Sequence, residues 1–147
     1  MSLYLVGNSK LSDKLRVLVC LELYLNSEYY ANHPYLHETY LANTHLFSDF
    51  KSILSIALSS EIELNLDNVN LIKKEALAMC VDNVFSSFIY VLALSSVIKR
   101  PINVHYPDFG LLVNRLVFDC EIFPRANDSF CLNSFGDPIN ILRGLPG

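Results

Sequence analysis

Hydrophobic residues recur three and four positions apart through the first two-thirds of the chain, the spacing that places them on one face of an α-helix. The helices predicted from this spacing run from Asp13 to about Asn26, from Pro34 through Ala42, from Thr44 or Ser48 to Ser59, from Leu71 to Asp82, and from Phe85 to Ile98. The first, for which Ser12 is a plausible cap, has almost no polar face. We therefore expect it to be buried on most sides.

The segment from Phe85 to Pro107 combines a helix, a turn and a strand, and we expect it to be the structural centre. Ser86 and Ser87 can cap the first turn, because their hydroxyls can accept hydrogen bonds from its free N–H groups. Pro101 has no amide hydrogen to continue the helix, so the helix ends before it. Beyond the proline, apolar and polar residues alternate from Ile102 to Tyr106, which predicts a strand.

The final third of the chain has a different character. Short β-rich runs at Leu111–Val113 and Leu116–Phe118 predict two strands, and Pro138 to Leu142 predicts a last short one. With helices first and strands last, the fold class is α+β, with a mostly helical N-terminal two-thirds packed on a small C-terminal β-sheet. The length fits one domain, residues 1–147, in which Leu92 should be among the most buried residues. Because no closing element follows the last strand, we expect this domain to be incomplete.

Composition limits the kinds of partner. Hydrophobic residues make up 52% of the chain, charged residues 18%, and the mean hydropathy is +0.31, so we expect apolar surface that needs a partner. The formal net charge is −4, and the basic residues form no cluster larger than Lys73-Lys74 and Lys99-Arg100. Proteins bind nucleic acids through dense positive charge, so no nucleic-acid binding is predicted.

The cysteines and the N-terminus indicate the compartment. Cys20, Cys80, Cys120 and Cys131 are widely spaced without a C-x-x-C pair, and we interpret them as reduced core thiols. The N-terminus lacks the basic region and apolar block of a signal peptide, which favours an intracellular location, cytoplasmic or nuclear, over secretion. The longest apolar run, Val84 to Ile98, contains four serines and is shorter than the roughly 20 residues of a membrane span. No membrane insertion is predicted.

A zinc site is the first chemical hypothesis. His33 and His37 stand four residues apart and could share a helix face, with Glu38 and His45 nearby. No third ligand follows at a fixed spacing, however, and partly exposed, tyrosine-rich helices often carry such histidines. We therefore predict no metal and no cofactor.

Cysteine catalysis is the second hypothesis. Cys20 would need a base and an exposed, electropositive surrounding, whereas it stands between two apolar residues of a predicted helix. His105 alternates onto the strand face opposite Val104, which is typical of a half-exposed strand histidine. The chain contains no G-x-x-x-x-G-K-[ST], G-x-G-x-x-G or G-x-S-x-G motif, so phosphate-binding loops and serine-hydrolase elbows are unsupported.

The Phe85–Pro107 segment also carries a family resemblance. A helix followed by ALSSVIKRPINVHYP resembles the part of OTU-type cysteine proteases, which have a papain-like fold, where an A-L-[AS] helix leads into an R-P-I-x-V strand. Within that superfamily the chain is most similar to the divergent OTU-like domains of vertnin and transposon-associated proteins. The matching residues are Ser86-Ser87, Tyr106-Pro107, Phe123-Pro124-Arg125 and, near the N-terminus, Gly7, Leu15-Arg16, Glu22-Leu23 and Tyr29-Tyr30.

The catalytic motifs of that superfamily are absent from this chain. In the enzymes, an Asp-Gly-Asn-Cys motif precedes the part that Ser2–Gly7 resembles, and the cysteine lies at a helix N-terminus, where the dipole favours the thiolate. The base histidine follows the last central strand, which Ile139–Leu142 resembles. Neither the motif nor a histidine after that strand is present. Cys20 and His105 are no substitutes, because neither stands at a matching position.

The resemblance implies a truncated, catalytically inactive OTU-like domain with no catalytic residues, acting as a protein-interaction module or remaining from a mobile element. Its partner would be ubiquitin or another protein. The alternative is a fragment of an active deubiquitinating cysteine protease whose Cys and His lie outside this chain. A third hypothesis, a small metal-binding or helical interaction protein of another fold, depends on His33 and His37.

Overall fold

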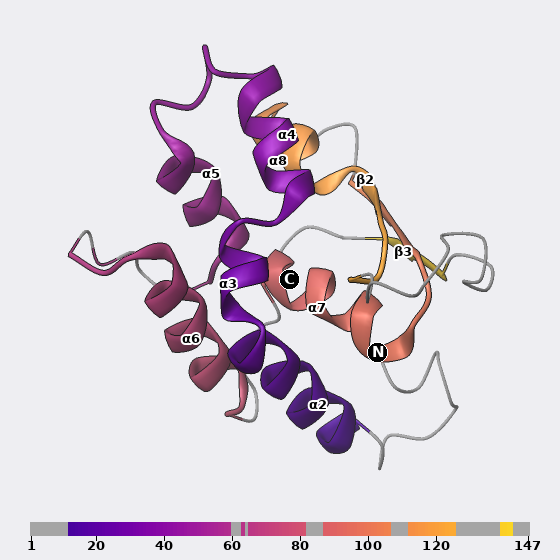
Figure 1. The fold of residues 1–147 in the computed structure, drawn as a ribbon. Coiled ribbons are helices and arrows are strands. Elements are labelled where there is room, and N and C mark those ends of the chain that lie inside the picture. Colours follow the sequence, from indigo (N-terminus) through magenta and orange to yellow (C-terminus); the bar gives the residue numbers. More distant parts are fainter. Residues whose placement is uncertain are drawn as a thin grey trace.

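The computed structural model describes residues 12–59, 63, 65–81, 87–106, 112–125 and 139–142. These residues form an α+β fold, as the sequence predicted (Figure 1). The helices are α2 (Ser12–Leu25), α3 (Ser27–Ala31), α4 (Pro34–Ala42), α5 (Phe50–Ala57), α6 (Asn68–Met79), α7 (Phe88–Ile98) and α8 (Leu112–Phe118), and the strands are β1 (Ile102–His105), β2 (Cys120–Ile122) and β3 (Ile139–Leu142).

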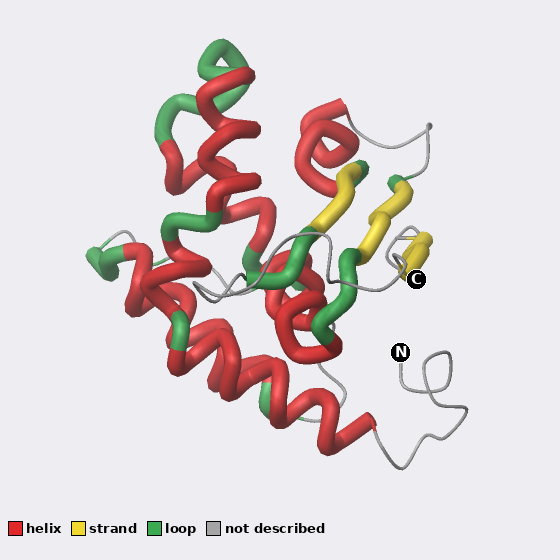
Figure 2. Tube along the Cα trace, turned by 45° about the vertical axis from the view of Figure 1, so that its right-hand side comes forward, coloured by secondary structure: helices red, strands yellow, loops and turns green. Residues whose placement is uncertain are grey.

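The three strands form one mixed sheet in the order β2-β1-β3. β1 pairs antiparallel with β2, where Ile102 stands opposite Ile122, and parallel with β3, where Ile102 stands opposite Ile139. Figure 2 shows the strands side by side at one edge of the molecule, with most of the helices on the other side. The strands predicted at Ile102–Tyr106 and Pro138–Leu142 are confirmed as β1 and β3, although β1 ends at His105 and Pro138 lies outside the described residues.

Helix α7 is the structural centre. Every residue from Phe88 to Ser95 is buried, and Leu92 has no exposed surface, as predicted. The helix contacts α2, α3 and α5, and it lies between α2 and the sheet in both ribbon views (Figures 1 and 2). A helix that is hydrophobic all round can be buried in this way. Among the described residues, no helix is both long and apolar enough to cross a membrane.

The two ends of α7 depart from the expected capping. Ser87 occupies the N-cap, but its side chain makes no capping bond, and its hydroxyl instead lies 3.9 Å from the sulfur of Met79. Ser86 lies outside the described residues. At the C-terminal end, Lys99 adopts the left-handed conformation with φ of 55°, and its backbone N–H donates to the Ser95 carbonyl. This reversal ends the helix before Pro101 can disrupt it.

Helix α8 replaces the two strands predicted at Leu111–Val113 and Leu116–Phe118, of which Leu111 lies outside the described residues. The burial of Val117 and Phe118 against the core stabilises it, since Phe118 packs 5.0 Å from the ring of Phe88. In addition, the Tyr35 hydroxyl from α4 donates to the carbonyls of Leu116 and Val117, at 3.2 and 2.7 Å, which satisfies acceptors that a helix leaves free at its C-terminal end. The strand in this part of the chain is β2, which follows α8.

Several helix starts also differ from the prediction. The third predicted helix begins at Phe50, rather than near Thr44 or Ser48, because the Asp49 carboxylate accepts the Ser52 N–H at 2.9 Å. Asp67 caps α6 in the same way. The short helix α3 was not predicted at all.

Candidate functional site

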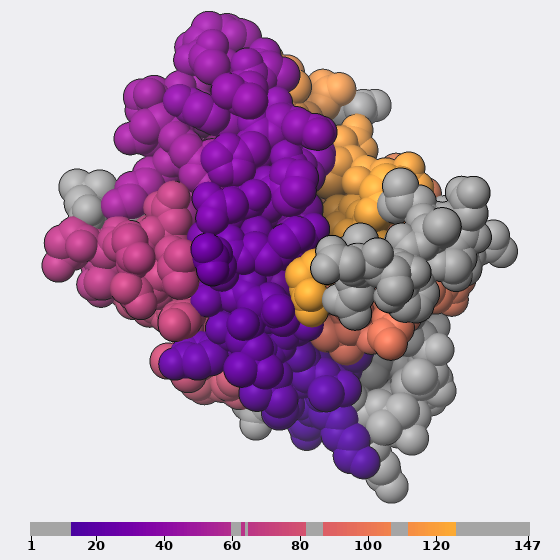
Figure 3. Space-filling view, in the orientation of Figure 1, coloured from indigo at the N-terminus to yellow at the C-terminus, as the bar shows by residue number. Residues whose placement is uncertain are grey.

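Helix α2 exposes a continuous apolar surface, which corrects the prediction that it is buried on most sides. From Asp13 to Leu25, only Val19, Cys20 and Leu23 of this helix are buried, whereas Leu18 is 51% exposed and Leu25 is 74% exposed. We call the surface the α2–α6 face and define it by six side chains that are each at least 40% exposed: Val17, Leu18, Leu21, Tyr24 and Leu25 of α2 and Leu77 of α6. In the space-filling view α2 and α3 run along the front of the molecule with α6 beside them (Figure 3).

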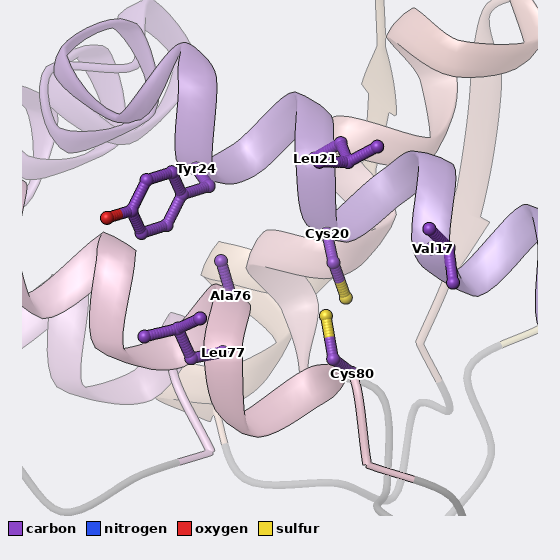
Figure 4. Close-up of a pocket in the computed structure, with 7 residues that line it drawn as sticks. All are labelled: Val17, Cys20, Leu21, Tyr24, Ala76, Leu77 and Cys80. Carbon is purple, nitrogen blue, oxygen red and sulfur yellow. The ribbon is translucent and has the colours of Figure 1, made fainter.

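An open groove lies within this face, between α2 and α6. Its volume is about 220 Å³, and it is lined by Val17, Cys20, Leu21, Tyr24, Ala76, Leu77 and Cys80 (Figure 4). This volume is below the roughly 300–1,000 Å³ typical of small-molecule pockets, so the groove suits a few apolar side chains of a partner better than a drug-sized ligand. The ammonium of Lys73 lies 5.5 Å from the centre of the Tyr24 ring, a distance at which the positive charge and the aromatic ring attract each other.

Two thiols face each other in this groove. Cys20 points from α2 toward Cys80, which follows the last residue of α6 (Figure 4). Burial, together with a hydrogen bond to the Cys80 side chain, raises the pKa of the Cys20 thiol to about 12. The predicted burial of Cys20 is confirmed. Cys80, however, is exposed because α6 ends at Met79, and Cys120 is only half-buried, so the prediction of core thiols was wrong for both. Cys131 lies outside the described residues.

The structure assigns His33 and His37 to separate packing roles. The Nδ1 atom of His33 caps α4 by accepting the Tyr35 N–H at 3.2 Å, and its ring stacks on Tyr30. Burial lowers the pKa of His33 to about 4. His37 instead stacks on Phe50 of α5, with the ring centres 4.1 Å apart. Within the described ranges, no three His, Cys, Asp or Glu residues gather in a way that could hold a metal ion.

His105 lies exposed at the end of β1, as expected for a strand histidine at the surface. The adjacent residue Val104 pairs with Cys120 of β2. Because side chains alternate between the two faces of a sheet, His105 and Cys120 project to opposite sides. This pair therefore cannot act as a nucleophile and its base.

A polar cluster joins residues that are distant in sequence. The Tyr30 hydroxyl lies 2.9 Å from Oε1 of Glu22 and 3.0 Å from Oγ of Ser96, and Ser96 in turn accepts the backbone N–H of Arg125 at 2.9 Å. The Nε atom of Arg125 donates to Oε1 of Glu22 at 2.9 Å, and Nδ2 of Asn26 donates to Oε2 of Glu22 at 3.1 Å. Through these hydrogen bonds the segment after β2 is held against α2, α3 and α7.

Three members of this cluster, Glu22, Tyr30 and Arg125, are among the residues that match the family pattern in the sequence. The hydrogen bonds to Glu22 raise the pKa of Arg125, and burial raises the pKa of Tyr30, so both remain protonated donors at neutral pH. Their geometry indicates that these residues stabilise the packing of segments that are distant in the sequence. Sequence spacing alone gave no sign that they meet.

Replacing Glu22 with Gln should lower the free energy of unfolding by about 1–2 kcal/mol, because the amide keeps the shape of the side chain but loses the charge-assisted bonds to Arg125. Both partners are partly exposed, which limits the loss. Chemical denaturation measures the effect. Glu38→Gln, at an exposed position of α4, is the matched control and should change stability by less than about 0.5 kcal/mol. Equal effects of the two substitutions would contradict the role of the cluster.

Comparison with known proteins gives one finding. A family model described as "Vertnin, OTU domain" matches residues 1–142, a range that includes the polar cluster, the α2–α6 face and all three strands. No curated protein and no solved structure gives a significant match.

Proposed function

The chain belongs to the vertnin OTU-domain family, and from this premise we propose that it is a catalytically inactive OTU-like domain that acts as a protein-interaction module. The α2–α6 face is the observation that carries the proposal. The burial of the Cys20 thiol supports its inactive character.

The case for inactivity begins with the chemistry that a cysteine protease needs. The nucleophile must be a thiolate within reach of a base. The sequence contains no Asp-Gly-Asn-Cys motif, and the last of its four histidines is His105, before β3. Cys20 is 3% exposed, and with a pKa of about 12 its thiol stays protonated at neutral pH. None of these groups supplies a Cys–His pair.

The case for binding rests on the apolar character of the α2–α6 face. Soluble domains seldom expose contiguous apolar side chains over a large area, and such patches commonly mark protein interfaces. Here the exposed residues follow one arc of α2 and continue to Leu77 of α6 across the groove. A partner with its own apolar side chains would remove this surface from water. Ubiquitin is the first candidate, because the OTU-type proteases that the chain resembles act on ubiquitin or similar modifiers.

Titration of the isotopically labelled chain with ubiquitin tests the binding surface. Amide resonance shifts should be confined to α2 and α6, and Leu21→Asp should weaken binding at least about tenfold, since a charge in the middle of an apolar interface is costly. Leu41→Asp is the matched control: Leu41 is equally apolar and 69% exposed, but it belongs to α4. Its binding should match that of the unmodified chain. If Leu21→Asp binds as well as the unmodified chain, the α2–α6 face is not the interface.

A hydrolysis assay tests the proposed lack of activity. Incubation with di-ubiquitin should release no more mono-ubiquitin than a buffer control, because the thiols of the chain lack an activating base. Cys20→Ser should leave this background unchanged. Cleavage that Cys20→Ser abolishes would instead show an active protease.

A further inference from the structure

Cys20 and Cys80 are brought together only by the packing of α2 against α6. Their positions differ by 60 in the sequence, and they share no motif. In the folded chain the two sulfur atoms point toward each other, with no other labelled side chain between them (Figure 4). Both carry free thiols. A disulfide requires two cysteine side chains that point toward each other, and the packing of α2 against α6 gives Cys20 and Cys80 this placement.

The two thiols differ in their access to solvent. Cys80 is exposed beyond the end of α6, whereas Cys20 is buried on the core side of α2. A small oxidant would therefore meet Cys80 first. Arg16 lies close by, since its Nη1 atom donates to the carbonyl of Met79, the residue before Cys80, at 3.2 Å. Cys20 is then in place to react with an oxidised Cys80.

We propose that Cys20 and Cys80 form a redox-sensitive site that hydroperoxides convert to an intramolecular disulfide. In the first step the Cys80 thiolate attacks the terminal peroxide oxygen, the O–O bond breaks, and Cys80 becomes a sulfenic acid while the released alkoxide or hydroxide takes up the proton that the thiol lost. In the second step the Cys20 thiol loses its proton, the resulting thiolate attacks Cys80 Sγ, the S–S bond forms, and the S–O bond breaks. The leaving hydroxide and the Cys20 proton form water. The two thiols together lose two electrons, and the peroxide accepts both.

The disulfide has a mechanical consequence for the α2–α6 face. It would link α2 covalently to the end of α6 at the groove, which restrains the distance between the two walls. It would also restrict the unfolded chain and so stabilise the folded domain. The site is independent of which molecule occupies the face, because it requires only the two thiols and an oxidant.

Treatment of the full chain with hydrogen peroxide tests the site, in a Cys120→Ala, Cys131→Ala background that leaves only the two thiols. Non-reducing peptide mass spectrometry should find the peptides that contain Cys20 and Cys80 linked, with the protein about 2 Da lighter, the mass of the two hydrogens removed. The thermal midpoint should rise by roughly 5–10 °C and return to its initial value after reduction. Cys80→Ser, a change at an exposed position that should not disturb folding, should abolish both effects.

The other outcomes overturn the proposal. A disulfide that links Cys80 residues of two chains would show that the buried thiol does not resolve the oxidised one. Irreversible oxidation of Cys80 beside an unmodified Cys20 would show the same. If the Cys80→Ser variant still gained thermal stability on oxidation, another group would be responsible for the shift.

Discussion

Leu92→Ala is expected to lower the free energy of unfolding by about 2–5 kcal/mol, because it removes buried methyl groups and leaves a cavity that the surrounding helices cannot fill. Leu92 has no exposed surface, and its neighbours on α7 are buried as well. Stability of folded domains is about 5–15 kcal/mol in total, so this single change would remove a large fraction of it. The midpoint and slope of a urea unfolding curve measure the loss.

Two control substitutions separate this effect from a general loss of side-chain atoms. Leu41→Ala removes the same atoms from a position that is 69% exposed, and Lys99→Ala changes an exposed residue at the end of α7. Each should alter stability by no more than about 0.5 kcal/mol. Equal effects of Leu92→Ala and Leu41→Ala would show that α7 is not the structural centre.

Acidification from pH 6.5 to pH 4 should destabilise the domain by about 3 kcal/mol through His33 alone. The folded protein holds this side chain neutral, with its pKa lowered by burial to about 4, whereas the unfolded chain has the ordinary value of 6.5. Between these two values the unfolded state binds a proton that the folded state does not, so stability falls as the pH decreases. The contribution is fully present above pH 6.5. The difference of about 2.5 pKa units corresponds to roughly 3 kcal/mol at 1.36 kcal/mol per unit.

The variant His33→Asn isolates this contribution. Asparagine is a good N-cap and can accept the Tyr35 N–H that Nδ1 of His33 accepts, but it does not titrate. Unfolding curves collected between pH 4 and pH 7 should therefore show a shallower pH dependence for the variant. His37→Asn, which removes the histidine stacked on Phe50, is the control and should retain the full dependence. An unchanged slope in His33→Asn would assign the pH dependence to other groups.

Local sequence was sufficient for the elements whose signals agree with one another. Helix α4 begins at Pro34 and ends at Ala42, as predicted, because a proline in the first turn and helical spacing specify the same segment. Two further elements were predicted correctly, the helix near Phe88–Ile98 and the strand after Pro101. The proline separates a helical spacing of apolar residues from the alternation of a strand, so the boundary is clear in the sequence. The α+β fold class followed from the order of these elements.

The tertiary structure decided what depends on contacts between distant residues. Leu112–Phe118 reads as β-rich, but it is helical because Tyr35 of α4 satisfies its last carbonyls and Phe118 packs on α7. A short apolar run is compatible with either state, so packing decides between them.

The same limit applies to the candidate site. The apolar character of α2 was visible in the sequence, but periodicity cannot say how many sides of a helix its neighbours cover, and here one arc stays exposed as the α2–α6 face. Cys20 and Cys80 meet, and Glu22 reaches Arg125, only because α6 and the segment after β2 pack beside α2. Contacts between such distant residues depend on the free energy of burying the whole core, to which residues far apart along the chain contribute together.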